Sequence, residues 1–140
     1  MPGVVHISEA ASLGLHAMIL LASDPARTFR TKEMAGLLRV SEDHLAKVLQ
    51  RLVRAELVGS MRGPRGGFTL GRDAADIRLL DIYETIEGPL KAGACLLGER
   101  RCELGCVLGD FITTTNEEFR RRFAQTRLAD VANVLGRLTP

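Results

Sequence analysis

The sequence has 140 residues, of which 46% are hydrophobic, so it is long enough for one compact domain with its own core. It has no Trp, one Tyr and five Phe, which leaves Leu, Val, Ile and Ala to build that core and favours helical packing. Three Cys without a basic, apolar export signal argue against a disulfide framework, and the apolar run 13–22 is too short to span a membrane. We therefore expect a mainly α-helical, cytoplasmic protein.

The positive charge is concentrated in one part of the chain. Residues 27–72 contain ten Lys and Arg but only four Asp and Glu, whereas the net charge of the whole chain is +2. A basic block on an otherwise acidic chain is typical of a protein that binds a polyanion such as nucleic acid. A solvated basic face would have the same composition, so the motifs within the block must distinguish the two.

Three helices are predicted in the first part of the chain. The first covers about 8–23, where apolar residues recur at helical spacing up to the Asp-Pro pair at 24–25. The second begins where Thr31 can cap it and ends near 39–40, and the third begins with Ser41 as its cap. The short turn between the second and third helices matches a helix-turn-helix, although many helical hairpins share this spacing.

The third helix is predicted to have one buried face and one face that contacts DNA. The residues expected to face inward are Leu45, Val48, Leu49 and Leu52. Ser41, His44 and Lys47 lie at the start of the helix or on its outward face, where side chains can reach base edges. Arg51, further along, is expected to meet a phosphate group.

Two short strands, 57–62 and 68–70, are predicted to form a hairpin called a wing. They are joined by the sequence Arg62-Gly63-Pro64-Arg65-Gly66-Gly67. Glycine lets the backbone come close to a phosphate, and Arg62 and Arg65 add positive charge beside it, so both are expected to enter a minor groove. An ordinary basic hairpin is the alternative, which the preceding helix pair makes less favourable.

All three cysteines lie in a stretch without sustained periodicity. A helix is predicted over 77–86, and the following residues, 89–106, contain Cys95, Cys102 and Cys106. A loop of this length usually needs a function or a bound group to order it. Soft thiolates select iron-sulfur clusters, zinc or copper(I), and the clustering favours metal binding over three free thiols. Zinc stays open as an alternative, because the spacing of Cys102 and Cys106 suits it, although the interval between Cys95 and Cys102 is long for a zinc knuckle.

The last part of the chain is predicted to carry a dimer interface. Apolar residues recur at helical spacing from Val107 to Phe123, which indicates an amphipathic helix that one small domain cannot cover and a partner subunit would. The basic run 120–122 beside it is interpreted as a solvated helix face. A short final helix is expected to pack back on the body. The predicted division is a DNA-binding part, 1–88, a cysteine loop, 89–106, and dimerisation and C-terminal helices, 107–140, within one compact unit.

Several stretches of the sequence together resemble one family. They are Gly14-Leu15-His16-Ala17-Met18, Arg62-Gly63-Pro64, Gly66-Gly67-Phe68, Asp73-Ala74-Ala75-Asp76-Ile77 and, downstream, Leu128-Ala129-Asp130-Val131. With the three-cysteine loop, they resemble the IscR/NsrR/RirA family of iron-sulfur transcription regulators. The resemblance implies a winged helix-turn-helix homodimer that reads successive major grooves of a palindromic operator. It also implies that Cys95, Cys102 and Cys106 hold an iron-sulfur cluster that senses redox state, nitric oxide or iron supply.

The resemblance leaves the fourth cluster ligand open. IscR-like members have a histidine three residues after the last cysteine, where this chain has Gly109, and NsrR-like members have an acidic residue in the first helix, where it has Ser12. His16 matches a histidine that other relatives use, and Glu9 and Ser12 lie on the same helical face. We expect His16 first, Glu9 second and Asp110 third, with a hydrogen-bonded His16 under the neighbouring subunit as the alternative. The cluster type, 2Fe-2S or 4Fe-4S, stays open.

The expected function is transcription regulation, with an affinity for DNA that is set by the cluster. The main alternative is a cluster-free regulator of the same fold that responds through its thiols or a small ligand. An enzyme is disfavoured because the sequence shows no paired carboxylates in a pocket-like context, no phosphate-binding glycine loop and no Ser/His/Asp order. A winged helix used only for protein contacts is disfavoured by the basic block.

Overall fold

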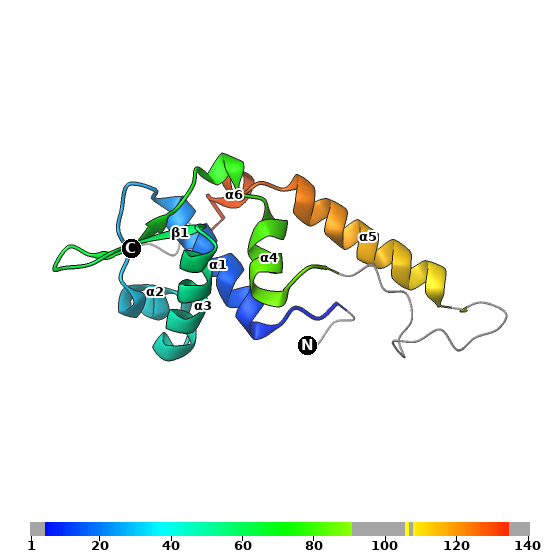
Figure 1. The fold of residues 1–140 in the computed structure, drawn as a ribbon, viewed down its shortest axis with the longest axis horizontal. Coiled ribbons are helices and arrows are strands. Elements are labelled where there is room, and N and C mark those ends of the chain that lie inside the picture. The colour runs from blue at the N-terminus through cyan, green and yellow to red at the C-terminus, as the bar shows by residue number, and fades with distance from the viewer. Residues whose placement is uncertain (1–4, 91–105, 107, 135–140) are drawn as a thin grey trace.

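The computed structural model describes residues 5–90, 106 and 108–134. Its elements in chain order are α1 (Glu9–Ser23), α2 (Thr31–Leu38), α3 (Glu42–Arg54), β1 (Val58–Met61), β2 (Gly67–Leu70), the 3-10 helix η1 (Ala74–Asp76), α4 (Leu79–Glu87), α5 (Gly109–Gln125) and α6 (Leu128–Val131). The hairpin and α5 project from opposite ends of a helical body (Figure 1). The mainly helical, winged helix-turn-helix fold expected from the sequence is confirmed.

Of the two predicted helix caps, Ser41 is confirmed, and Ser8 is a further cap that was not predicted from the sequence. The Ser8 hydroxyl accepts a hydrogen bond from the Ala11 amide and starts α1, and the Ser41 hydroxyl does the same for α3. The cap expected at Thr31 is wrong, because Thr31 is the first helical residue and Arg30 occupies the cap position without a capping hydrogen bond. The Arg30 guanidinium instead donates to the Pro64 carbonyl, 34 residues further along the chain.

The core lies where α1 packs against α3 and α4. The four α3 residues predicted to face inward are all buried: Leu45, Val48, Leu49 and Leu52. On α1, a Cβ added to Gly14 would lie 3.2 Å from Ile86 Cγ1 of α4 and 3.6 Å from Val48 Cγ1 of α3. A hydrogen atom at position 14 therefore allows the three helices to meet closely.

The wing is a two-stranded antiparallel sheet in which Val58 lies opposite Leu70. Strand β2 is also attached to the chain before α2, because Phe29 and Phe68 exchange two backbone hydrogen bonds with N–O distances of 3.0 and 2.7 Å. Gly67 has a φ of +146°, and a Cβ there would lie 2.4 Å from the Phe29 carbonyl oxygen. Only glycine fits this position without moving backbone.

Two helices, α4 and α6, begin with the same local arrangement. The Arg78 amide donates to Asp81 over 2.9 Å at the start of α4, and the Arg127 amide donates to Asp130 over 2.8 Å at the start of α6. Burial opposes ionisation of Asp81, but its hydrogen bonds from Arg78 outweigh this and hold the pKa of its carboxyl below the usual value. An antiparallel bridge joins Arg78 to Arg127, and Leu128 is fully buried, so α6 packs back on the body as predicted.

The α5 helix extends away from the body and carries no buried residue (Figure 1). Its contact with α4 includes Tyr83, whose ring centroid lies 5.3 Å from that of Phe119 and 5.8 Å from that of Phe123. Phe111 is 68% exposed. The helix predicted over 77–86 is observed as α4, preceded by η1, which the sequence did not predict. No helix in the described ranges is long and apolar enough to cross a membrane.

Candidate nucleic-acid interface

The residues expected to reach base edges lie at the start of α3. Ser41 and Lys47 are exposed, and His44 is half-buried. The Ser41 hydroxyl is engaged as the helix cap, and His44 Nδ1 lies 3.6 Å from Glu9 Oε1 of α1. Lys47 has no hydrogen-bond or ion-pair partner among the described residues. Its ammonium group is therefore available to a polyanion.

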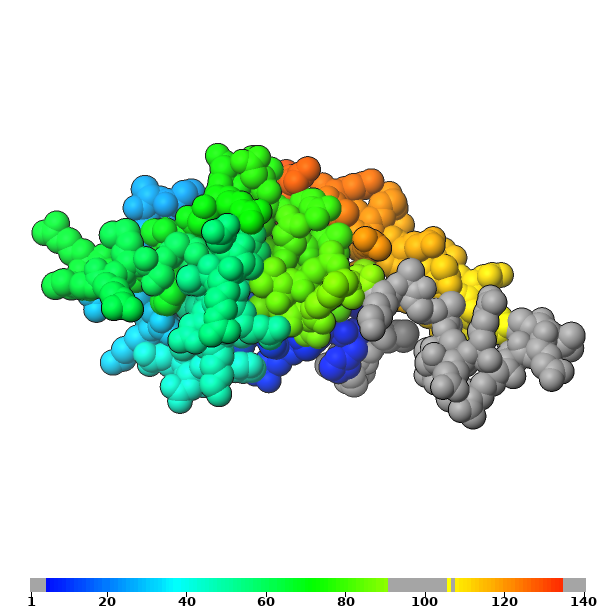
Figure 2. Space-filling view, in the orientation of Figure 1, coloured from blue at the N-terminus to red at the C-terminus, as the bar shows by residue number. Residues whose placement is uncertain are grey.

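The wing presents two more basic side chains. Arg62 and Arg65 are exposed in the loop between β1 and β2, and the hairpin protrudes from the body in the space-filling view (Figure 2). A hydrogen bond of 2.9 Å from the Gly66 amide to the Gly63 carbonyl closes the turn, while Arg30 binds the Pro64 carbonyl. The tip is thus tied to the residue before α2.

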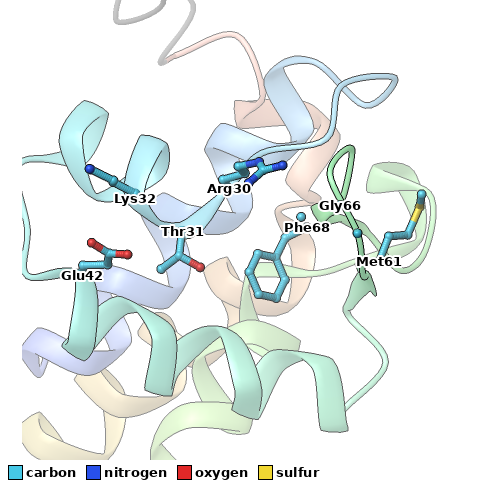
Figure 3. Close-up of a pocket in the computed structure, with 9 residues that line it drawn as sticks. Arg30, Thr31, Lys32, Glu42, Met61, Gly66 and Phe68 are labelled. Atoms are coloured by element: carbon cyan, nitrogen blue, oxygen red, sulfur yellow. The ribbon is translucent and has the colours of Figure 1, made fainter.

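A groove joins the first turn of α2, the first turn of α3 and the wing in one continuous surface (Figure 3). It has a volume of about 340 Å³. Its lining residues are Arg30, Thr31, Lys32, Glu42, Met61, Gly63, Gly66, Gly67 and Phe68. Arg30 and Lys32 are exposed, and the first amides of α2 are not capped by a side chain, so this end of the groove attracts anions. The sequence placed both residues in the basic block but could not show that they lie beside the wing.

Arg51, expected to meet a phosphate, is exposed and also contacts α4. Its Nη2 donates to the Ile86 carbonyl over 2.5 Å and lies 3.5 Å from the Thr85 carbonyl, both in the last turn of α4. The contact is between α3 and α4, so the sequence around Arg51 carries no local signal for it. At least part of this guanidinium is therefore engaged inside the molecule.

Only one of the three candidate cysteine ligands lies within the described residues. Cys95 and Cys102 lie outside them, while Cys106 is exposed just before α5. A Cβ at Gly109 would lie 3.2 Å from the Cβ of Cys106 and 3.9 Å from its sulfur, so glycine keeps this side of the thiol open. Asp110 is exposed in the first turn of α5. Among the described residues no group of three or more His, Cys, Asp or Glu could hold a metal.

The candidate ligands on α1 do not all point to one place. His16 Nδ1 lies 2.7 Å from the Ser12 carbonyl oxygen, which can only accept a hydrogen bond. In a neutral imidazole the proton is then on Nδ1, and Nε2, which has no hydrogen-bond partner among the described residues, carries the lone pair. The side chain of Glu9 is 80% exposed and approaches His44 instead. The structure thus brings Ser12 and His16 together, whereas the contact that Glu9 makes is with His44.

Two arginines of the basic run on α5 pair with one carboxylate of the same helix. Arg121 and Arg122 both donate to the carboxylate of Glu118, and these hydrogen bonds lower the pKa of that carboxyl to about 2. All three side chains are accessible to solvent. This arrangement agrees with the interpretation of the run as a solvated helix face.

Comparison with known proteins decides the family. A family model described as Rrf2, iron-dependent transcriptional regulator, matches residues 7–134. The chain belongs to the Rrf2 family. The resemblance seen in the sequence is thereby confirmed at the level of the family. The family is described as one of transcriptional regulators, and relatives of this chain are named as HTH-type transcriptional regulators.

Individual Rrf2 relatives differ in how much of their length they share with this chain. YwgB of Bacillus subtilis, named as an HTH-type transcriptional regulator, is 38% identical over 101 residues, which are 66% of this chain and 65% of YwgB. BadM of Rhodopseudomonas palustris is 37% identical over 83 residues, 59% of this chain and 53% of BadM. The chain therefore aligns with less than two thirds of either relative. An HTH-type regulator of Aquifex aeolicus is 28% identical over 131 residues, 91% of both chains.

Two solved structures resemble the whole described fold. CymR, the global cysteine regulator of B. subtilis, superposes with a TM-score of 0.80 at 27% identity, covering 94% of this chain and 98% of CymR. IscR of T. potens superposes with a TM-score of 0.77 at 25% identity, covering 98% of this chain and 93% of IscR.

Proposed function

We propose that this Rrf2 protein binds a palindromic DNA operator as a homodimer and that an iron-sulfur cluster sets its affinity for that operator. The observation that supports DNA reading most directly is the continuous groove between α2, α3 and the wing. Lys47 on α3 and Arg62 on the wing are exposed and have no partner among the described residues, so they are suited to base edges in the major and minor grooves. Arg65, Arg30 and Lys32 supply phosphate contacts, which makes the affinity strongly dependent on salt.

The homodimer is supported by α5. This helix of 17 residues has no buried residue, and Leu108 and Phe111 at its start are exposed. Because a helix of this length gains most of its stability from packing, a second copy of the chain is the proposed cover for its apolar side. Two copies joined in this way carry two recognition helices, as a palindromic operator requires.

Placing a charge at Phe111 should separate the two copies. For Phe111→Asp we expect the dimer dissociation constant to rise by at least about tenfold, because a buried carboxylate without a partner costs more than the apolar contact that it replaces. Sedimentation velocity over a concentration series measures this. Glu117→Ala, also at an exposed position of α5, is the control and should sediment like the parent protein. Equal dissociation constants for Phe111→Asp and the parent would contradict the proposed interface.

The donor groups of this chain are chemically suited to an iron-sulfur cluster. Cys106 offers an exposed thiol with open space at Gly109, and a neutral His16 with its proton on Nδ1 offers the lone pair of Nε2 to a metal. Cys95, Cys102 and Cys106 are the proposed thiolate ligands, with His16 as the fourth and Glu9 or Asp110 as lesser candidates. A bound cluster would supply a redox-active and nitric-oxide-reactive group. The residues of the chain hold it and transmit its state to the DNA-binding surface.

Anaerobic purification tests the cluster directly. We expect a coloured protein that contains iron and sulfide and loses both in Cys106→Ser. The visible spectrum should change in His16→Ala and stay that of the parent in Glu9→Ala, on the same helix. A changed spectrum in Glu9→Ala with an unchanged one in His16→Ala would assign the fourth ligand to Glu9 instead. A colourless parent protein without iron or sulfide would contradict the proposal and favour a cluster-free regulator that responds through its thiols.

A further inference from the structure

The last turn of α4 has two carbonyl groups that its own backbone leaves without a partner. In a continuous helix, the amide of residue 89 would bind the Thr85 carbonyl, but residue 89 is a proline and has no N–H. The amide of Leu90, which would bind the Ile86 carbonyl, donates instead to Glu84 Oε2 over 2.9 Å. The end of α4 therefore needs a donor from elsewhere in the molecule.

Arg51 of α3 supplies this donor. Its Nη2 lies 2.5 Å from the Ile86 oxygen and 3.5 Å from the Thr85 oxygen. The positive charge also lies at the negative end of the α4 dipole, which stabilises the contact further. Arg51 therefore acts as a capping residue for a helix that is not its own.

Other contacts gather at the same junction of three helices. Beneath Arg51, the side chains of Val48 and Ile86 meet at Gly14 of α1. The Ser8 hydroxyl donates to Glu87 and so joins the start of α1 to the end of α4. His44 and Glu9 approach each other between α3 and α1. The Arg51 hydrogen bonds thus close a set of links that fixes α3 relative to α1 and α4.

We infer that Arg51 is a positioning residue and not a DNA contact: it holds the recognition helix α3 at its working angle by capping α4. This inference rests on the proposed DNA-binding function. The contact also links α4 to the affinity for DNA, because a displacement of the last turn of α4 moves the carbonyl groups that Arg51 binds and thereby the angle of α3. The cysteine-bearing stretch follows α4 in the sequence, so this junction is suited to transmit a change that begins there.

The test compares Arg51→Met with Lys47→Ala in the full-length protein. Methionine keeps most of the aliphatic length of arginine and removes the donors. In the free protein, amide hydrogen exchange in the last turn of α4 should become about tenfold faster in Arg51→Met, because the terminal carbonyls lose a charged donor. Lys47→Ala should leave that exchange unchanged. Thermal unfolding of both variants verifies that they fold.

The DNA arm uses a duplex selected by the parent protein from a random-core library, titrated over a series of salt concentrations. Arg51→Met should bind about tenfold more weakly, but the steepness with which the logarithm of the binding constant falls with the logarithm of the salt concentration should equal that of the parent. In Lys47→Ala this steepness should decrease by about 0.9 if Lys47 contacts one phosphate, and it should stay unchanged if Lys47 contacts only a base. A steepness lowered by about 0.9 in Arg51→Met, with unchanged exchange in α4, would overturn the inference. A parent protein that selects no duplex would overturn the proposed function, and the exchange arm would still report whether Arg51 holds α4.

Discussion

Replacing Gly67 with alanine is expected to destabilise the protein by about 3 kcal/mol and to weaken DNA binding by at least about tenfold. The new Cβ would lie 2.4 Å from the Phe29 oxygen and 2.9 Å from Thr28 Cγ2, at a residue whose φ of +146° already excludes most side chains. The obstacle is backbone that is itself held by the hydrogen bond from the Phe68 amide. The wing must therefore move away from α2, and the groove between them opens.

Gly36→Ala is the control for this prediction. It makes the same chemical change in α2, where a Cβ would meet nothing within 4 Å. Alanine in a helix is favoured over glycine, so Gly36→Ala should raise the free energy of unfolding by about 0.5–1 kcal/mol and leave DNA affinity unchanged. Denaturant unfolding and fluorescence anisotropy with a selected duplex measure both quantities. A Gly67→Ala protein as stable as the parent would show that the wing is not held against Phe29.

The second large effect is expected from removing one cation from α3 and one from the wing. Lys47→Ala with Arg62→Ala should weaken binding to a selected duplex by about 100-fold or more, since each contact to a base contributes about 1–3 kcal/mol. Both side chains are exposed and have no partner among the described residues, so the free energy of unfolding should change by less than about 0.5 kcal/mol. Anisotropy at fixed salt measures the loss.

Arg121→Ala with Arg122→Ala controls for net charge, because it removes two positive charges from α5. Both arginines already pair with Glu118, and the groove does not include them. This variant should bind within about threefold of the parent at physiological salt, where distant charges are screened. Equal losses in the two double variants would mean that only total charge matters and that α3 and the wing are not the reading surface.

The DNA-binding half could be predicted well from short stretches of sequence, because the interactions that form its helices are made between residues close in the chain. Ser41 caps α3 with its own hydroxyl, and Val48 and its apolar neighbours are spaced for one buried face. The cap was predicted wrongly at Thr31 because a Thr shortly before a Glu has the sequence pattern of a helix cap. Arg30 occupies the cap position instead, and its guanidinium donates to the Pro64 carbonyl of the wing. The role of Arg51 depends on Pro89 and on α4, which no short window of sequence contains.

The candidate metal site could be predicted only as a set of residue types. Three soft thiols in a short stretch indicate a metal or cluster whatever the fold, and Cys106 is accessible as such a role requires. The spacing on α1 placed Glu9, Ser12 and His16 on one face, but it could not show that Glu9 turns toward His44 on a different helix. The ligand set therefore remains a prediction, with His16 favoured by its free Nε2.

The coupling between cluster and DNA is tested most directly by comparing the two forms of one preparation. Anaerobically purified protein, with iron and sulfide quantified, is divided, and one half is stripped with a chelator in the same buffer. Both halves are titrated into one selected duplex at one salt concentration. We predict dissociation constants that differ by at least about fivefold, the lower end of coupling between two sites in a protein. Equal dissociation constants for the two forms would contradict cluster control of DNA binding.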